Sequence, residues 1–112
     1  MKNWILRIRA SDKQIFDDIK SGLKTVETRA ATEKYRKIAP GDTLIFTCEK
    51  ERMRKTVKEV TRFATRDKMC KEIPFKQISP RAATEKEAKE KYDTFPGYQE
   101  KIKKFGLVAL YL

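Results

Sequence analysis

The sequence Ser21-Gly22-Leu23-Lys24-Thr25-Val26-Glu27-Thr28-Arg29 marks the point where the first predicted helix gives way to a strand. Glycine readily adopts the left-handed backbone that ends a helix, and the residues after it are suited to a strand. On an ideal strand Glu27 and Arg29 point to the same side, whereas Lys24, close to the glycine, can turn to either side. The stretch therefore predicts either a salt bridge that pins a strand or a polar ligand site.

The three charged side chains have a definite chemistry if they converge. Lys24 and Arg29 would then hold Glu27 ionised and lower its pKa. An arginine fork and a lysine amine are also donors for a phosphate or a carbonyl group. Lys24 is in addition a candidate catalytic base, because a desolvated lysine can activate a hydroxyl group without histidine. The residues alone leave the salt bridge and the ligand site as equal alternatives.

The composition indicates one domain, residues 1–112, with a strongly basic surface. The chain has 27 lysines and arginines against 16 acidic residues, a net charge of +11. Such an excess favours polyanionic partners, nucleic acid above all. The excess is concentrated in residues 20–37 and 50–62, each with six basic and two acidic side chains. We therefore expect RNA or a nucleotide as the partner, with a protein partner as an alternative.

Several classes of site and location are disfavoured by what the sequence lacks. It contains no histidine, which removes the Ser-His and Cys-His catalytic pairs and the commonest zinc ligand. Cys48 and Cys70 form no CxxC motif, and Cys48 lies in an apolar run that predicts a buried thiol. We expect no metal and no cofactor. Without a signal-peptide pattern or a membrane-length apolar run, we expect a cytoplasmic monomer with no membrane contact.

Periodicity and turn residues predict the remaining elements of an α+β fold. The expected strands are residues 4–9, 24–29, 43–48, 52–64 and 106–112. The expected helices are residues 12–21, 65–73, 84–92 and 99–105. The segment 74–80 is expected to be irregular, and 30–39 to be a loop or one helical turn.

Finer signals refine this outline. Ser11 with Gln14, and Thr84 with Glu87, have the spacing of capping boxes at helix starts. Within residues 52–64 the apolar positions change parity, which predicts a bulge or a sharp twist. Tyr35, Phe95 and Tyr98 fall in predicted loops or turns, where an aromatic ring can stack on a nucleic-acid base. The alternative for each is a residue that packs at the edge of the core.

The octapeptide 22–29 resembles the G-x-K-x-x-E-x-R signature of the ASCH family, the activating-signal-cointegrator homology domains. Further features resemble the family at the expected places. A predicted helix precedes the motif, Gly41-Asp42 opens the next strand, and a Phe-Pro-Gly turn precedes a closing strand that contains Val108-Ala109-Leu110. The resemblance thus covers nearly the whole chain.

This resemblance implies a PUA-like fold, a small β-barrel of five or six strands with flanking helices. It also implies a cleft beside the motif in which RNA or a modified nucleoside sits. Carried over by position, Lys24, Glu27 and Arg29 are the expected cleft residues, and Gly22 shapes the turn before them.

One branch of the family is similar to amidohydrolases that deacetylate N4-acetylcytidine. That branch uses the motif lysine, a threonine three residues later and a distant glutamate. The position three residues after Lys24 is Glu27, and Thr25 and Thr28 are each displaced by one residue. Since a shift of one residue reverses the strand face, Thr28 is a poor replacement. Four residues are candidates for the distant glutamate: Glu72, Glu85, Glu87 and Glu90.

We therefore predict that the chain binds RNA, or a nucleotide-like ligand, in a basic cleft around the motif. Lys24 and Arg29 would engage a phosphate or carbonyl group, and Glu27 would accept from a base amino group or orient Arg29. The alternative is a small hydrolase of modified nucleosides or single-stranded RNA, with Lys24 and Glu27 as the candidate catalytic residues. A protein-interaction module is the second alternative.

Overall fold

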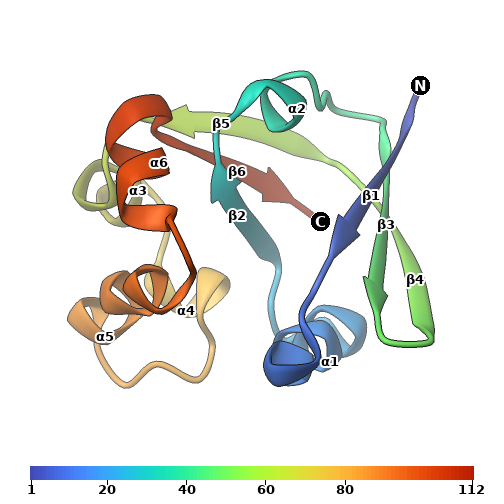
Figure 1. The fold of residues 1–112 in the computed structure, drawn as a ribbon, viewed down its shortest axis with the longest axis horizontal. Coiled ribbons are helices and arrows are strands. Elements are labelled where there is room, and N and C mark those ends of the chain that lie inside the picture. Colours follow the sequence, from blue (N-terminus) through green and yellow to red (C-terminus); the bar gives the residue numbers. More distant parts are fainter.

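Six strands form two three-stranded sheets, and the helices pack around them (Figure 1). The structure is a computed structural model that describes all 112 residues. The strands are β1 Asn3–Arg7, β2 Val26–Ala30, β3 Thr43–Cys48, β4 Glu51–Thr56, β5 Glu59–Phe63 and β6 Leu107–Tyr111. The helices are α1 Lys13–Ser21, α2 Glu33–Arg36, α3 Arg66–Glu72, α4 Phe75–Ile78, α5 Glu85–Glu90 and α6 Tyr98–Phe105. Two 3-10 turns, η1 Ala10–Asp12 and η2 Lys91–Thr94, complete the chain.

The first sheet has the order β1-β3-β4 and buries one face only. β3 pairs in parallel with β1 and antiparallel with β4. Along β3 buried residues alternate with half-buried ones, as a sheet with one solvated face requires. Leu6, Leu44 and Phe46 on the inner face pack with Phe16 and Ile19 of α1. Cys48 lies in the same cluster, so the predicted buried thiol is confirmed.

The second sheet has the order β2-β6-β5, with both pairs antiparallel. Its central strand β6 is buried from Leu107 to Leu110, so the closing strand predicted over residues 106–112 is covered on both faces. In Figure 1 helices α3 to α6 lie to one side of this sheet, and the β1-β3-β4 sheet lies to the other. The opening stretch thus contributes a strand, β2, that lies between the first sheet and this group of helices.

The single strand expected over residues 52–64 is wrong, because the segment is divided between the two sheets. The Val57 amide donates to the Asp42 carbonyl at 2.9 Å, beside the first sheet. The next amide, that of Lys58, donates to the Tyr111 carbonyl at 2.7 Å in the second sheet. The parity change was therefore a real signal. It marks a crossing between sheets rather than a bulge within one strand.

The start of α1 also differs from expectation. Ser11 lies in the turn η1, and no side chain caps the helix that follows. The Gln14 amide group donates to Asp18 at 3.1 Å instead of returning to the helix start. The predicted Ser11–Gln14 capping box is therefore wrong. The end of α1 is as predicted: Gly22 has φ +84° and its amide donates to the Ile19 carbonyl at 3.2 Å.

Three further helical segments are α5, α2 and α4. Thr84 accepts from the Glu87 amide at 3.1 Å and begins α5, so this capping signal is confirmed. The expected turn around Tyr35 is α2. Residues 74–80, expected to be irregular, contain the short helix α4. None of the helices has the length and hydropathy that a transmembrane segment requires.

The α+β class is confirmed by this arrangement. The two sheets have separate hydrogen-bond ladders. A closed barrel therefore stays a prediction.

Candidate ligand-binding cleft

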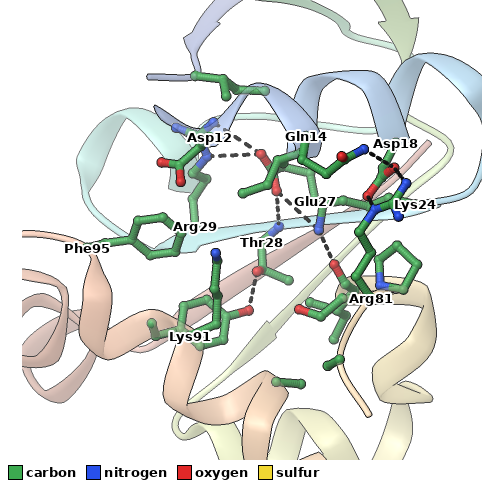
Figure 2. Close-up of a pocket in the computed structure, with 18 of the residues that line it drawn as sticks. Asp12, Gln14, Asp18, Lys24, Glu27, Thr28, Arg29, Arg81, Lys91 and Phe95 are labelled. Carbon is green, nitrogen blue, oxygen red and sulfur yellow. Dashed lines mark hydrogen bonds and ion pairs between the residues drawn. The ribbon is translucent and has the colours of Figure 1, made fainter. Parts of the chain in front are cut away.

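A cleft of about 380 Å³ opens between α1, β2 and the segment that runs from α4 to the start of α6 (Figure 2). Lys24, Glu27 and Arg29 all line it, so the structure brings the three predicted site residues together. The cationic residues in its lining are Arg7, Arg9, Lys24, Arg29, Arg81 and Lys91. The acidic residues are Asp12, Asp18, Glu27 and Glu87.

Glu27 is the centre of the polar network in this cleft. Its side chain is 7% exposed and both of its oxygens are engaged. Oε1 accepts from the Thr28 amide at 3.1 Å and lies 3.5 Å from the Lys24 ammonium. Oε2 accepts from Nε and Nη2 of Arg29, at 3.3 and 3.1 Å. Four contacts occupy the carboxylate, so its capacity to accept from a ligand is largely used.

Lys24 is as deeply buried as its partner. Its ammonium donates to the carbonyl oxygen of Ile78, the last residue of α4, as well as facing Glu27. The backbone also holds it, because the Lys24 amide donates to the Asp18 carbonyl at 3.0 Å. The unpredicted helix α4 thus supplies one of the partners that fix this lysine. A lysine ammonium has three donors, so one remains for a ligand.

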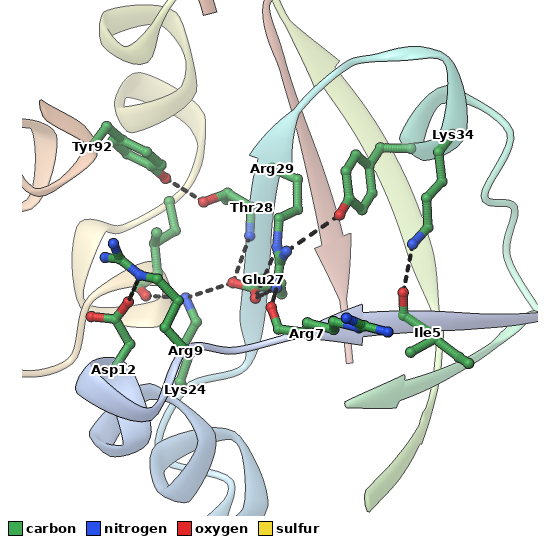
Figure 3. A network of polar contacts seen from close by, with 12 residues as sticks. Ile5, Arg7, Arg9, Asp12, Lys24, Glu27, Thr28, Arg29, Lys34 and Tyr92 are labelled. Atoms are coloured by element: carbon green, nitrogen blue, oxygen red, sulfur yellow. Dashed lines mark hydrogen bonds and ion pairs between the residues drawn. The ribbon is translucent and has the colours of Figure 1, made fainter. Parts of the chain in front are cut away.

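Arg29 joins the site to the first sheet (Figure 3). Besides its two bonds to Glu27, its Nη2 donates to the carbonyl of Arg7 in β1 at 3.3 Å. Its Nη1 donates to the Tyr35 hydroxyl at 3.3 Å, and the guanidinium lies 5.7 Å from the centre of that ring. A guanidinium has five N–H donors, so these four bonds leave one on Nη1. The orientation of this arginine is therefore fixed before any ligand binds.

The burial of this trio changes how its members titrate. Burial lowers the pKa of Lys24, although the Glu27 carboxylate counteracts part of that effect. Burial alone would raise the pKa of Glu27, but Arg29 and Lys24 together outweigh it and lower that pKa. Glu27 therefore stays ionised, as expected from the sequence, whereas Lys24 holds its proton less firmly than a surface lysine.

Thr28 lies on the opposite face of β2 from Glu27, as strand parity predicts. Its hydroxyl is hydrogen-bonded to the hydroxyl of Tyr92 in η2. Burial raises the pKa of Tyr92, so this phenol remains protonated. Thr25 is exposed and does not line the cleft. Neither threonine takes the position of Glu27 beside Lys24 and Arg29.

Aromatic rings form another wall of the cleft. Phe95 and Tyr98 line it and meet edge to face, with ring centres 5.4 Å apart. Tyr92 also meets Phe95 edge to face, with ring centres 6.4 Å apart. The Arg9 guanidinium lies 5.3 Å from the Phe95 ring centre. Two of the three aromatic residues singled out in the sequence therefore face the cleft.

The cations around the mouth of the cleft differ in how they are compensated. Arg81 makes two hydrogen bonds with the buried carboxylate of Asp18, at 2.9 and 3.0 Å. Arg9 pairs with Asp12 at 2.8 Å. Arg7 and Lys91 have no carboxylate within ion-pairing distance and are exposed. These two side chains are the free positive charges of the cleft.

Other predicted residues lie elsewhere. Gly22 ends α1 outside the cleft lining, and Tyr35 stands behind Arg29 rather than in the cleft. Of the four candidate glutamates only Glu87 lines the cleft, and its carboxylate accepts from the Ala83 amide at 3.2 Å. Sequence reasoning missed Asp18, Arg81 and Lys91. No local pattern distinguishes them from other charged residues, and Arg81 and Lys91 reach the cleft from more than fifty residues beyond Arg29.

Comparison with known families identifies the family of this chain. The model of the ASCH domain family matches residues 12–112. The chain belongs to the ASCH domain family. The match includes the whole Gly-x-Lys-x-x-Glu-x-Arg motif and most of the elements that line the cleft. No curated protein matches this ASCH domain in sequence.

Two solved structures resemble this ASCH domain over almost its whole length. The crystal structure of hypothetical protein PH0355 has a TM-score of 0.82 and 27% sequence identity, covering 99% of this chain and 96% of that chain. The solution structure of protein PF0455 from Pyrococcus furiosus has a TM-score of 0.73 and 27% identity, covering 99% and 94%.

Proposed function

We propose that this ASCH domain binds RNA, or a nucleotide-like ligand, in the cleft beside β2. The observation that carries the proposal is the convergence of Lys24, Glu27 and Arg29 on one wall of a cleft that also has aromatic side chains and free cations. A salt bridge that only pinned a strand would not need an open cleft beside it. Membership of the ASCH family supports the same reading, through the motif that these residues occupy.

The hydrogen bonds of Lys24, Glu27 and Arg29 indicate a different role for each residue. Lys24 and Arg29 each retain an unused N–H, and both line the cleft, so they would donate to a phosphate or carbonyl oxygen. Glu27 is occupied by its neighbours and acts as a positioning residue that orients Arg29 and holds Lys24. Of the two roles predicted for Glu27, the structure therefore favours the orientation of Arg29 over acceptance from a base.

The rest of the cleft suits a nucleotide in size and chemistry. About 380 Å³ lies at the small end of the range for small-molecule pockets, enough for one nucleotide. Phe95 and Tyr98 would stack on the base, which any base permits because each has a π-face. Arg7 and Lys91 would neutralise phosphate at the mouth. Stacking on the base and neutralisation of the phosphate together predict a site with affinity for nucleotides and modest preference among bases.

Calorimetric titration with uridine 5′-monophosphate tests this proposal. We expect the affinity for this nucleotide to fall as salt is raised. We also expect Arg29→Gln to reduce the affinity at least tenfold. Lys68→Gln, an equal change of charge on the distant helix α3, is the control and should leave affinity unchanged. Binding that is equal in wild-type and Arg29→Gln protein would refute the assignment of the cleft.

One observation supports the hydrolase as a second candidate. Burial lowers the pKa of Lys24, which is the change that would prepare an amine to act as a base. Glu87, in the same cleft, is then the candidate distant carboxylate. Incubation with N4-acetylcytidine should release cytidine and acetate, and Lys24→Ala should abolish the release while the fold is kept. Absence of turnover by the wild-type protein would leave ligand binding as the function.

Resemblance to the ASCH family also implies a PUA-like barrel. We propose that the two sheets correspond to the two halves of a PUA-like barrel, joined where the chain crosses at Val57 and Lys58. The Arg29 bond to the Arg7 carbonyl, between β2 and β1, supports this relation at the opposite edge.

A further inference from the structure

The solvated face of the β1-β3-β4 sheet is a separate surface that the cleft does not include. The register places three rows of side chains across it: Asn3–Thr43–Thr56, Ile5–Ile45–Arg54 and Arg7–Thr47–Arg52. Ile5 is 45% exposed, which is unusual for a large apolar side chain. The sheet's other face receives α1, and Figure 1 shows no helix over the outer edge at β4.

The charge on this face is almost entirely positive. Arg7, Arg52 and Arg54 are all exposed and none forms an ion pair or a side-chain hydrogen bond. Glu49, in the turn between β3 and β4, lines a groove on this face together with Arg7 and Arg52. Arg52 and Arg54 belong to the basic segment 50–62, which contributes no residue to the cleft beside β2. Their charge therefore needs a different explanation.

Arg7 connects this face to the cleft. A shallow groove of about 340 Å³ runs over the sheet and is lined by Ile5, Arg7, Ile8, Thr47, Glu49 and Arg52. Arg7 and Ile8 also line the cleft beside β2. The carbonyl of Arg7 accepts from Arg29, so the end of β1 lies directly against the proposed site (Figure 3). Arg7 therefore adjoins both the cleft and the groove on the sheet face.

We propose that this face, through Arg7, Arg52 and Arg54, binds the phosphate backbone of a single-stranded RNA whose one nucleotide occupies the cleft. The inference rests on the proposed function, because it takes the cleft to hold a nucleotide. It adds that the ligand is an oligonucleotide rather than a free nucleotide, and it gives the path of the strand.

Charge and shape favour this occupant. Three unpaired arginines on a row-like surface suit successive phosphates, and release of condensed counterions then contributes to affinity. Arginine also binds phosphate with two parallel hydrogen bonds. Ile5 and Ile45, in the same row as Arg54, offer apolar contact to ribose and base, whereas these three rows contain no aromatic ring for specific stacking. The face therefore binds with little dependence on sequence. A flexible single strand can bend from the cleft onto it, which a stiff duplex cannot.

The test compares one oligomer and one nucleotide in matched variants. Fluorescence anisotropy would measure binding of a labelled 12-nucleotide oligouridylate, and calorimetry would measure binding of uridine 5′-monophosphate. The face variant is Arg52→Gln with Arg54→Gln, since neither residue lines the cleft. The control is Lys68→Gln with Lys71→Gln on α3, two exposed lysines without ion pairs and the same total change of charge. Arg29→Gln is the cleft variant.

We expect the face variant to bind the oligomer about tenfold more weakly and the nucleotide as wild type does. The negative slope of log affinity against log salt should decrease in magnitude by about 1.4, or about 0.7 for each of two lost phosphate contacts. Equal oligomer affinity and slope in the face and control variants overturn this inference while leaving the cleft intact. Oligomer binding that falls in the face variant but not in Arg29→Gln supports the face and overturns the proposed function. Absence of any oligomer binding by wild type overturns this inference, and only absence of nucleotide binding as well overturns the proposed function.

Discussion

A single oxygen of Glu27 accepts two hydrogen bonds from Arg29, one from Nε at 3.3 Å and one from Nη2 at 3.1 Å. The other oxygen is held by the Thr28 amide and faces Lys24. The carboxylate therefore neutralises two cations and fixes the direction of both. The cleft is built with its donors already in place, which reduces the entropy lost when a ligand binds.

Removal of the Glu27 charge should destabilise the protein. In Glu27→Gln the Lys24 ammonium and the Arg29 guanidinium remain buried with no carboxylate, and uncompensated buried charge costs several kcal/mol. We expect the free energy of unfolding to fall by about 3 kcal/mol, measured by urea denaturation at neutral pH.

The double variant Lys24→Met with Glu27→Gln separates charge from packing. It removes one cation along with the carboxylate, so it should recover part of the loss. A double variant that is less stable than Glu27→Gln alone would show that Lys24 does not depend on Glu27 for its compensation.

Arg29→Lys keeps the positive charge but removes the planar fork. A lysine cannot contact Glu27, Tyr35 and the Arg7 carbonyl together, since it has one nitrogen in place of three. We expect uridine 5′-monophosphate to bind at least tenfold more weakly, with a loss of stability smaller than that of Glu27→Gln. Calorimetry and urea denaturation of the same preparation measure both effects. An affinity equal to wild type would mean that charge alone, without orientation, is sufficient.

The wall of the cleft that β2 forms was predictable from the sequence, because the residues that make it are close together along the chain. A glycine stop, a strand period of two and the spacing of three charges place Lys24, Glu27 and Arg29 within eight residues. The family resemblance added that the site is a cleft. Tyr35 illustrates the limit of this reasoning: an aromatic residue near the motif was expected to meet the ligand, yet it supports Arg29 from behind.

The opposite wall, formed by the segment from α4 to η2, was not predictable from the sequence, for a physical reason. Arg81, Lys91 and the Ile78 carbonyl come from segments at least 54 residues beyond Lys24, and only the tertiary fold sets their positions. The division of residues 52–64 has a similar cause. Strand propensity is continuous through Val57 and Lys58, so it cannot show that neighbouring amides bond to different sheets.

Loss of the Phe95 ring should affect nucleotides but not small anions. Base stacking on an aromatic side chain contributes about 1–3 kcal/mol by alanine substitution, equivalent to about 5- to 150-fold in affinity. We expect Phe95→Ala to weaken uridine 5′-monophosphate within that range and to leave inorganic phosphate binding unchanged, both measured by calorimetry. Phe95→Leu, which keeps apolar bulk without the π-face, is the matched control. An equal effect of Phe95→Ala on both ligands would argue against stacking.

Nucleotide affinity should depend on pH through Lys24. Because burial lowers its pKa below the ordinary value of 10.5, the ammonium loses its proton at lower pH than surface lysines do. We expect the affinity for uridine 5′-monophosphate to fall in that alkaline range as the positive charge is lost. Lys24→Met should bind more weakly at neutral pH and show a smaller fall. Identical pH profiles for the two proteins would exclude Lys24 from the ligand contacts.

Acid stability should depend on Asp42 at the start of β3. Hydrogen bonds from the Trp4 indole and from the Lys2 and Ala39 amides lower its pKa from 3.8 to about 2. Because the folded pKa lies below the unfolded one, this stabilisation is complete above pH 3.8 and is lost as pH falls through 2.

We therefore expect Asp42→Asn to lower the free energy of unfolding at neutral pH by about 1–2 kcal/mol and to flatten its decline in acid. Urea denaturation monitored by the fluorescence of Trp4, the only tryptophan, measures both. Asp17→Asn, a change at an exposed carboxylate, is the control. Parallel acid profiles of wild type and Asp42→Asn would contradict the assigned role.

The most direct test of the central claim is a titration of 15N-labelled protein with uridine 5′-monophosphate, followed by amide chemical shifts. If the cleft beside β2 is the binding site, the shifts will change at Lys24, Thr28, Arg29, Phe95 and Tyr98, and Arg29→Gln will abolish the changes. Shift changes confined to residues outside the cleft, or no change at saturating nucleotide, would contradict the claim.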